Sequence, residues 1–196
     1  MKAVAYGSYE GGLRELIHLL KYGGVRPAAK VLGRMLADAI SHLDNALGEE
    51  NLLIVPVPLH PKKLRQRGFN QSELIAQAAL KLMQSPHRFQ LAPKAMERRR
   101  ETQSQIGLSR HQRRENMRGA FAVNRADEIK NKSILVVDDV FTTGTTVSEC
   151  ARVLRRAGAS KVYAATVART LKMELQGATF EVPEVESEVA MAAHAS

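Results

Sequence analysis

The sequence predicts an α/β domain in which a mostly parallel β-sheet is flanked by helices, with a helical segment at the N-terminus. Short apolar runs alternate with stretches whose apolar residues recur at helical spacing, which is typical of parallel strands joined by helices. A length of 196 residues and a hydrophobic content of 44% suffice for one such domain. One apolar run, residues 134–137, leads into an acidic pair, a threonine-rich turn and an amphipathic helix.

Two amphipathic helices are expected in the first fifty residues. Apolar residues recur at helical spacing over residues 10–21 and again over residues 28–43. The glycine pair at 23–24 separates the two patterns, and Pro27 suits the first turn of the second helix. Residues 1–50 are therefore predicted to form an N-terminal helical segment.

A short buried strand and a basic loop are expected next. Residues 51–55 form the strand, and the prolines at 56 and 58 end its ladder because proline lacks an N–H. Residues 56–69 then form a loop with four cations within six residues, before a helix that Asn70 caps and that ends near Met83. This loop would open at the sheet edge where parallel strands end, and its cations would bind phosphate oxygens. The candidates are His60, Lys63, Arg65 and Arg67. The alternative is a solvated basic turn.

The most informative stretch joins a strand over 133–138 to a helix over about 147–157. Asp138 and Asp139 end the strand, where open α/β sheets bind ligands. The helix start favours an anion, and Gly144 lets the backbone approach a ligand closely. The stretch therefore suits a ligand with a phosphate beside hydroxyls, such as a ribose 5-phosphate. An ordinary strand–turn–helix is the alternative, although adjacent carboxylates repel each other. Hydroxyl donors come from Thr142, Thr143, Thr145 and Thr146.

An arginine-rich region separates these two segments. Residues 94–118 hold eight lysines and arginines against three glutamates and show little apolar periodicity. A solvated loop, a helix over residues 109–118 with a charged face, and a nucleic-acid-binding patch are all consistent with this composition. Residues 121–123 and 161–168 are expected to be further strands.

Composition limits the function classes. The net charge of +9 divides into +13 over residues 1–170 and −4 over residues 171–196, so the body suits phosphates, pyrophosphate or nucleic acid. The acidic residues 171–196 are predicted to be a loosely ordered tail, with a short edge strand near 178–182. The single cysteine, Cys150, excludes an intramolecular disulfide and suits a reducing compartment. No apolar run approaches the roughly 18 residues of a membrane span, and no signal peptide is recognised, so a cytoplasmic protein without membrane contact is expected.

The acidic pair followed by Thr-Thr-Gly-x-Thr resembles the ribose-phosphate motif of type I phosphoribosyltransferases. In that family the acidic pair holds the ribose 2′- and 3′-hydroxyls, and the threonine loop wraps the 5-phosphate. The resemblance implies that Asp138 and Asp139 are catalytic residues and that residues 142–146 bind the 5-phosphate: Thr142, Thr143, Gly144, Thr145 and Thr146.

Two further segments are similar to the ComF family of phosphoribosyltransferase-like proteins, whose members include bacterial competence proteins linked to DNA uptake. One is Pro-Val-Pro-Leu-His-Pro with Arg-x-Arg-Gly-Phe-Asn-Gln after it, and the other is Leu-Arg-Glu-Leu-Ile-His-x-Leu-Lys-Tyr-Gly-Gly. The similarity runs from about Tyr9 to Arg169. Family members commonly begin with a four-cysteine zinc-binding module, and this sequence has no cysteines that could build one.

The resemblance implies a phosphoribosyltransferase that binds phosphoribosyl pyrophosphate with Mg²⁺, transfers ribose 5-phosphate to an unidentified acceptor and releases pyrophosphate. Mg²⁺ would be held through the substrate, with no metal ligand directly from the protein. Residues 1–50 would form a hood, 51–170 the transferase core and 171–196 the tail. The alternative is a non-catalytic competence factor that binds phosphoribosyl pyrophosphate or single-stranded DNA, with other competence proteins as partners. A mobile loop that closes over the ligand would carry Arg98, Arg99, Arg100, Arg110 and Arg114.

Overall fold

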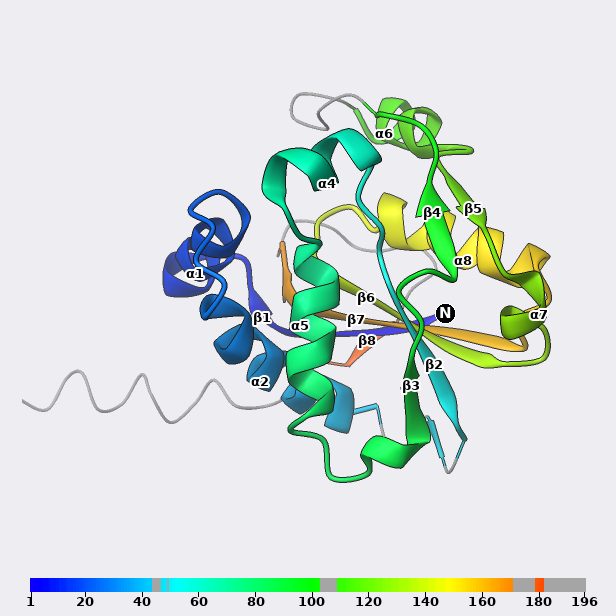
Figure 1. Ribbon diagram of the computed structural model, residues 1–196, viewed down its shortest axis with the longest axis horizontal. Helices are drawn as coiled ribbons and strands as arrows, with labels where there is room; N and C mark the ends of the chain where they lie inside the picture. The colour runs from blue at the N-terminus through cyan, green and yellow to red at the C-terminus, as the bar shows by residue number, and fades with distance from the viewer. Residues whose placement is uncertain (44–46, 49, 103–108, 171–178, 182–196) are drawn as a thin grey trace, which may run out of the picture.

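The computed structural model describes residues 1–43, 47, 48, 50–102, 109–170 and 179–181. Within these residues a six-stranded sheet has the order β3-β2-β6-β7-β1-β8, and all its neighbouring strands are parallel (Figure 1). The strands of this sheet are β1 (Lys2–Ser8), β2 (Leu52–Pro56), β3 (Phe89–Leu91), β6 (Ser133–Phe141), β7 (Lys161–Arg169) and β8 (Thr179–Glu181). A separate antiparallel pair is made by β4 (Met96–Arg98) and β5 (Phe121–Val123).

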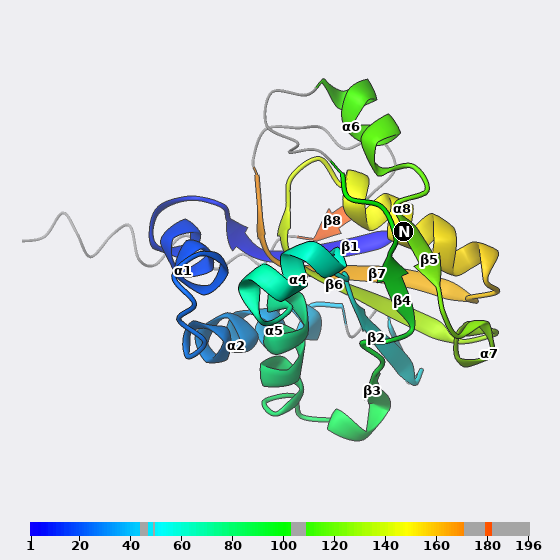
Figure 2. The ribbon, with the colours of Figure 1, turned by 45° about the horizontal axis from the view of Figure 1, so that its top comes forward.

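Helices cover both faces of the sheet (Figures 1 and 2). One face packs against α1, α2 and α5, and the other against α8 together with α6, α7 and the β4–β5 pair. The helices are α1 (Gly11–Lys21), α2 (Ala28–Ser41), α4 (Pro61–Arg67), α5 (Gln71–Leu80), α6 (Arg110–Met117), α7 (Ala126–Ile129) and α8 (Thr145–Arg156), with a 3₁₀ turn η1 (Pro86–Arg88).

The central strand β6 explains why the two faces are both apolar. Leu135 and Val137 belong to the core under α1, α2 and α5, whereas Ile134 and Val136 belong to the core under α8. Successive side chains of a strand point to opposite faces, so a strand buried on both sides reads as a continuous apolar run. The fold class predicted from this run is confirmed.

The long elements follow their sequence patterns closely. The predicted helices over 10–21 and 28–43 are α1 and α2, and the predicted strand over 51–55 is β2. Asn70 caps α5 by accepting from the backbone N–H of Ser72 at 3.1 Å, as expected of an N-cap residue. The edge strand expected near 178–182 is β8, while the rest of the predicted tail, 171–178 and 182–196, lies outside the described residues.

Several short elements were not predicted. The N-terminal residues form the strand β1 between β7 and β8, although alanine and glycine are depleted in strands and only Ala3, Val4 and Ala5 are buried there. The three-residue strands β3 and β4 and the one-turn helix α7 are too short to show periodicity. Among the described residues, no helix combines the length and apolarity that a membrane crossing needs.

The contact between α2 and α5 has a glycine at its centre and gives a test of the packing. A Cβ on Gly33 would overlap the Ala78 Cβ and lie 2.9 Å from the Ala78 carbonyl carbon, which is backbone and cannot rotate away. Glycine-to-alanine changes inside helices usually stabilise by roughly 0.5–1 kcal/mol. We expect Gly33→Ala instead to lower the free energy of unfolding by about 1–3 kcal/mol, because overpacking outweighs the helix propensity.

Urea denaturation followed by circular dichroism measures this change. Gly12→Ala in α1 is the matched control, because a Cβ there meets nothing within 4 Å. The control should be neutral or slightly stabilising. A Gly33→Ala protein as stable as the wild type would contradict the packing described here.

Candidate functional site

The acidic pair lies inside β6, whereas the sequence suggested that the pair ends the strand. The strand continues to Phe141, and Asp138 is still paired with Thr166 of β7. On its other side β2 ends at Pro56, opposite Val137, so the pair begins where β2 stops. Both residues are buried, with whole-residue exposed fractions of 9% for Asp138 and 3% for Asp139. The pair therefore lies near the carboxyl end of a central strand, immediately beyond the residue at which the neighbouring strand β2 ends.

Asp138 is held by two hydrogen-bond donors. The Ser72 hydroxyl, at the start of α5, donates to Asp138 Oδ1 at 3.0 Å, and the backbone N–H of Asp139 donates to the same oxygen at 3.0 Å. Burial, reinforced by the negative charge of Asp139, raises the pKa of Asp138 to about 8. Near neutral pH this carboxyl therefore tends to carry a proton.

Asp139 has the opposite electrostatic state. Its Oδ2 forms an ion pair with the Lys21 ammonium, from the last residue of α1. Burial alone would raise the pKa of Asp139, but the charge of Lys21, together with hydrogen bonds from Asp138 and Lys21, outweighs it and holds the pKa below its usual value. Burial likewise opposes the charge of Lys21, yet attraction to Asp139 and then Asp138 raises the pKa of Lys21. The two neighbouring carboxyls are thus pushed apart in pKa, one towards the protonated form and one firmly ionised.

The threonine turn that follows is accessible. Thr142 is exposed, and Thr143, Thr145 and Thr146 are partly exposed. The Thr143 and Thr145 hydroxyls lie 2.8 Å apart. Because the first N–H groups of a helix have no partner within the helix, the start of α8 presents donors beside these hydroxyls. The turn is thus open to an anion from outside, as the predicted 5-phosphate loop requires.

Gly144 shapes this turn. Its φ of +71° lies in the left-handed region, and a Cβ would be only 2.5 Å from Cζ of Phe141. Its carbonyl accepts from the N–H of Ser148 at 2.8 Å, which starts the helical hydrogen bonding of α8. Glycine is required here both for the backbone angle and for the close approach of the Phe141 ring.

The basic segment forms the short helix α4, and not the loop that the sequence suggested. Pro61 supplies a preformed first turn, and Gly68 ends the helix with a φ of +78°. His60 is the N-cap residue, and its Nδ1 accepts from the N–H of Lys62 at 3.4 Å. The helix was missed because it is short and mostly exposed, so its sequence shows no apolar face.

The cations of α4 differ in their surroundings. Burial, with repulsion from Arg98 and Arg67, lowers the pKa of Lys63, so Lys63 lies within electrostatic reach of both arginines. Arg67 donates to Gln71 Oε1, and its guanidinium lies 5.7 Å from the centre of the Tyr22 ring. Arg65 is exposed. Lys63 is therefore the predicted phosphate ligand that interacts electrostatically with Arg98.

The three described arginines of the predicted mobile loop have different partners. Arg98, in β4, donates to the Thr102 hydroxyl and lies 5.5 Å from the Phe121 ring centre. Burial lowers the pKa of Arg98, and the nearby charge of Asp138 works against this effect. Arg99 forms an exposed ion pair with Glu97 at 2.6 Å.

Arg100 has a structural partner. Its guanidinium donates to the backbone carbonyls of Asn116 and Arg118, both at 2.8 Å, and so caps the C-terminal end of α6. Arg110 and Arg114 lie in α6, but their side chains, and the whole of residues 103–108, lie outside the described residues. Of the described arginines in this region, Arg98 is the one that interacts electrostatically with the acidic pair.

Two members of the site were missed by sequence reasoning. Ser72 is fully buried, and its position as the second residue of a capped helix gave no hint of its carboxyl partner. Lys21 had a detectable signal, since it follows Ile17 by four residues and so lies on the apolar face of α1. A lysine on an apolar face needs a counter-charge, and Asp139 supplies it.

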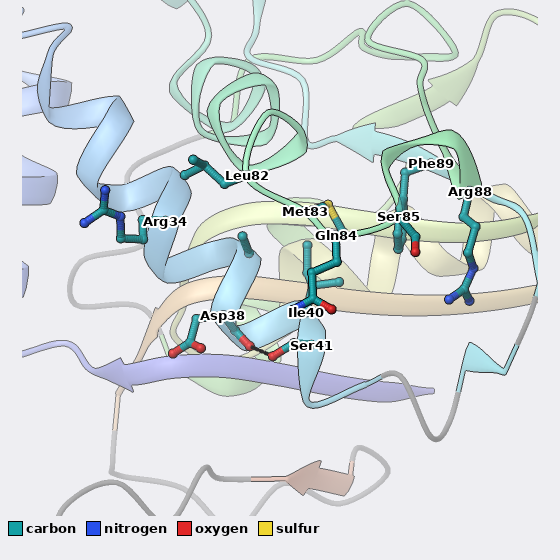
Figure 3. A pocket seen from close by; sticks show the side chains of 11 residues that line it. Arg34, Asp38, Ile40, Ser41, Leu82, Met83, Gln84, Ser85, Arg88 and Phe89 are labelled. Carbon is teal, nitrogen blue, oxygen red and sulfur yellow. Dashed lines mark hydrogen bonds between the residues drawn. The ribbon is translucent and has the colours of Figure 1, made fainter.

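A pocket of about 430 Å³ lies elsewhere, between α2 and the segment from the end of α5 to β3 (Figure 3). Arg34 and Arg88 lie at its two ends, and Phe89, the first residue of β3, lines it. The pocket is therefore at the amino end of a strand. Ligands of parallel sheets bind at the carboxyl ends, where the acidic pair and the threonine turn lie, so the candidate site is placed there.

The chain is similar to known proteins over most of its length. A family model described as "Phosphoribosyl transferase domain" matches residues 79–182, which include the acidic pair and the threonine turn. DNA utilization protein YhgH of Escherichia coli (strain K12) is 34% identical over 171 residues, covering 87% of this chain and 73% of the relative. Competence protein F of Haemophilus influenzae is 32% identical over 174 residues, with 86% and 72% covered.

Two further similarities are more distant. Competence protein ComFC of Bacillus subtilis is 23% identical over 164 residues and is covered over 62% of its length. Among solved structures, a hypoxanthine phosphoribosyltransferase from Staphylococcus aureus is 14% identical with a TM-score of 0.42, covering 82% of this chain and 76% of that one.

The raised pKa of Asp138 makes stability depend on pH. Between its ordinary value near 3.8 and about 8, the folded protein holds a proton at Asp138 that the unfolded chain has lost. The unfolded state binds fewer protons in this window, so the free energy of unfolding should fall as pH rises through it. In Asp138→Asn this contribution disappears, and we expect a shallower fall between pH 5 and pH 8 than in the wild type.

Urea denaturation at several pH values measures the slope. Asp127→Asn, an exposed carboxylate in α7, is the matched control and should keep the slope of the wild type. Parallel pH profiles for the wild type and Asp138→Asn would show that Asp138 is already ionised throughout this range.

Proposed function

The chain belongs to the phosphoribosyl transferase domain family, in the ComF group of competence-related proteins, and from this premise we propose that it binds phosphoribosyl pyrophosphate with Mg²⁺. The observation that carries the proposal is the buried acidic pair of β6 beside the accessible threonine turn at the start of α8. One strand–turn–helix thus offers carboxylates that accept hydrogen bonds from hydroxyls and N–H and O–H groups that donate to a phosphate. A ribose 5-phosphate carries both hydroxyls and a phosphate.

The acidic pair would bind the ribose. Asp139 is ionised and can accept hydrogen bonds from sugar hydroxyls at once. Asp138 would accept one after losing its proton, and a hydroxyl donating to it favours that loss. The turn from Thr142 to Thr146 would bind the 5-phosphate through its hydroxyls and the first N–H groups of α8.

The opposite end of the ligand carries the pyrophosphate. Lys63 of α4 lies within electrostatic reach of Arg67 in the same helix and of Arg98 in β4. Burial and mutual repulsion lower the pKa of Lys63, and a bound polyanion would relieve this repulsion. Cations held near each other before binding suit a leaving group that gains negative charge.

Mg²⁺ fits the oxygen-rich side of the site. Within the described residues no group of three or more His, Cys, Asp or Glu side chains could hold a metal ion, so the ligand's own oxygens would supply most of the coordination. Asp138 and Asp139 would hold the ribose hydroxyls, so Mg²⁺ would be held through the ligand and not directly by the protein. When bound, Mg²⁺ would neutralise charge on the pyrophosphate.

The reaction we propose is transfer of ribose 5-phosphate to an acceptor. The bond between C1′ and the pyrophosphate oxygen breaks, a bond from C1′ to the acceptor forms, and pyrophosphate leaves. No nucleophile on the protein is required, so the residues act by positioning and by charge. Asp138 and Asp139 hold the ring, and the cations of α4 and β4 stabilise the departing charge.

Two neighbouring lysines of α4 test the pyrophosphate end. Lys63 lies within electrostatic reach of Arg98 and Arg67, whereas Lys62 pairs with Glu101 at 3.4 Å. A hydrogen bond to a charged group contributes about 1.5–3 kcal/mol, so Lys63→Met should weaken binding of Mg²⁺–phosphoribosyl pyrophosphate roughly 10- to 100-fold. Lys62→Met is the matched control and should change affinity by less than about threefold.

Titration calorimetry gives these affinities. Ribose 5-phosphate, which lacks the pyrophosphate, should bind the wild type and Lys63→Met equally. A wild-type protein that shows no heat of binding with Mg²⁺ and phosphoribosyl pyrophosphate at millimolar concentration would rule the proposal out. If phosphoribosyl pyrophosphate binds, measuring pyrophosphate release in the presence of different bases, amines and sugars would identify the acceptor.

A second candidate function is binding of single-stranded DNA without catalysis. The names of the relatives, DNA utilization protein and competence protein, favour it, as does a charge of +13 over residues 1–170. Binding through phosphates should weaken steeply with salt, with a logarithmic slope of about −0.7 per phosphate neutralised. Filter binding of a single-stranded oligonucleotide across salt concentrations measures the slope. Affinity that is unchanged by salt would exclude this candidate.

A further inference from the structure

The acidic pair already has a cationic partner from the protein itself. Lys21 ends α1 and places its ammonium on Asp139 Oδ2, with exposed side-chain fractions of 18% for Lys21 and 5% for Asp139. Both carboxyls of the pair attract this ammonium. Lys21 also repels Lys63 electrostatically. The same ammonium therefore acts on the acidic pair and on a cation of α4.

This ion pair uses the oxygen that a ligand would need. A carboxylate oxygen has two positions that accept hydrogen bonds. An ammonium at contact distance occupies one of them and neutralises the charge of the carboxylate. In a site with little exposure, a sugar hydroxyl or a divalent cation cannot gain the full attraction of Asp139 while the ammonium remains. Ligand and Lys21 thus compete for the same carboxylate.

The backbone after Lys21 is suited to a change of position. Tyr22 is the C-cap residue that follows α1 and is 73% exposed, and Gly23 and Gly24 come next, with Gly24 at a φ of +65°. The Tyr22 ring lies 5.7 Å from the Arg67 guanidinium and 5.2 Å from the His18 ring. The end of α1 is therefore held at two points, Asp139 and Arg67, which are both among the groups assigned to the ligand.

We propose that Lys21 is an internal counter-ion that occupies the acidic pair in the ligand-free protein and is displaced when the ligand binds. The proposal rests on the proposed function, and it adds a condition for entry. The acidic pair rejects a divalent cation alone, because Lys21 already neutralises Asp139. A ligand that brings hydroxyls to Asp139 and a polyanion to Arg67 releases both ends of the contact together and is admitted.

Removing the ammonium tests the competition directly. In Lys21→Met, the uncompensated pair should bind Mg²⁺ alone, seen as a rise in melting temperature at millimolar Mg²⁺ that the wild type does not show. The same variant should bind Mg²⁺–phosphoribosyl pyrophosphate at least about fivefold more tightly than the wild type, because no internal cation has to be displaced.

Controls separate this effect from general changes of charge. Lys30→Met removes an exposed lysine of α2 and should behave as the wild type in both measurements. The double variant Lys21→Met with Asp139→Asn should lose the response to Mg²⁺ alone, since the carboxylate that attracts the metal is gone. If Lys21→Met does not fold, Lys21→Gln, which keeps a polar group, replaces it in both measurements. Folding of either variant that is restored by Mg²⁺ supports the proposal, and failure of both to fold in any Mg²⁺ concentration overturns it.

The two proposals fail in different ways. If Lys21→Met binds Mg²⁺–phosphoribosyl pyrophosphate as tightly as the wild type or more weakly, Lys21 does not compete with the ligand. The proposal of an internal counter-ion is then overturned while the proposed function stands. If neither the wild type nor Lys21→Met binds phosphoribosyl pyrophosphate, the proposed function fails, and the measurement with Mg²⁺ alone still decides whether Lys21 occupies the acidic pair. No response of Lys21→Met to Mg²⁺ in that measurement overturns the inference.

Discussion

Two adjacent carboxyls in the interior of a parallel sheet are the constraint on which the site depends. Asp138 and Asp139 lie in β6, where burial alone would favour the protonated form of both. The structure gives them unequal partners, a serine hydroxyl for Asp138 and the Lys21 ammonium for Asp139. Lys21 helps to keep Asp139 ionised, whereas burial and the charge of Asp139 raise the pKa of Asp138 to about 8. The pair can remain at the sheet edge because only one full negative charge has to be compensated inside the protein.

Elements from distant parts of the sequence meet around this pair. Lys21 arrives from α1, Ser72 from α5 and Arg98 from β4, and the threonine turn follows β6 directly. Each element is anchored by packing that has no part in ligand contact, such as the close approach of Gly33 to α5. A change in that packing would move charged groups relative to one another. The stability of the two cores and the electrostatics of the site are therefore coupled through the helices.

The arginine-rich region illustrates how different roles share one composition. Arg98 makes a cation–π contact with Phe121 and is attracted by the charge of Asp138, whereas Arg100 caps α6 and Arg99 pairs at the surface. All three come from one run of identical side chains. They separate because Arg98 is the last residue of β4, whereas Arg99 and Arg100 follow the strand and Arg100 reaches the end of α6. A count of cations in a loop therefore overstates the number available to a ligand.

The sequence by itself determined the parallel α/β sheet, the long helices and the strand–turn–helix with its acidic pair and threonines. Those features are local, because apolar periodicity, an N-cap or a glycine at positive φ depends on residues close together in the chain. Only the tertiary structure decided that β1 joins the sheet, that the basic segment is a helix, and that Lys21 and Ser72 are the partners of the pair. Asp139 and Lys21 are far apart in sequence, and their ion pair exists because α1 packs on one face of β6. The charge state of a buried carboxyl is set by such packed neighbours, and no local pattern records them.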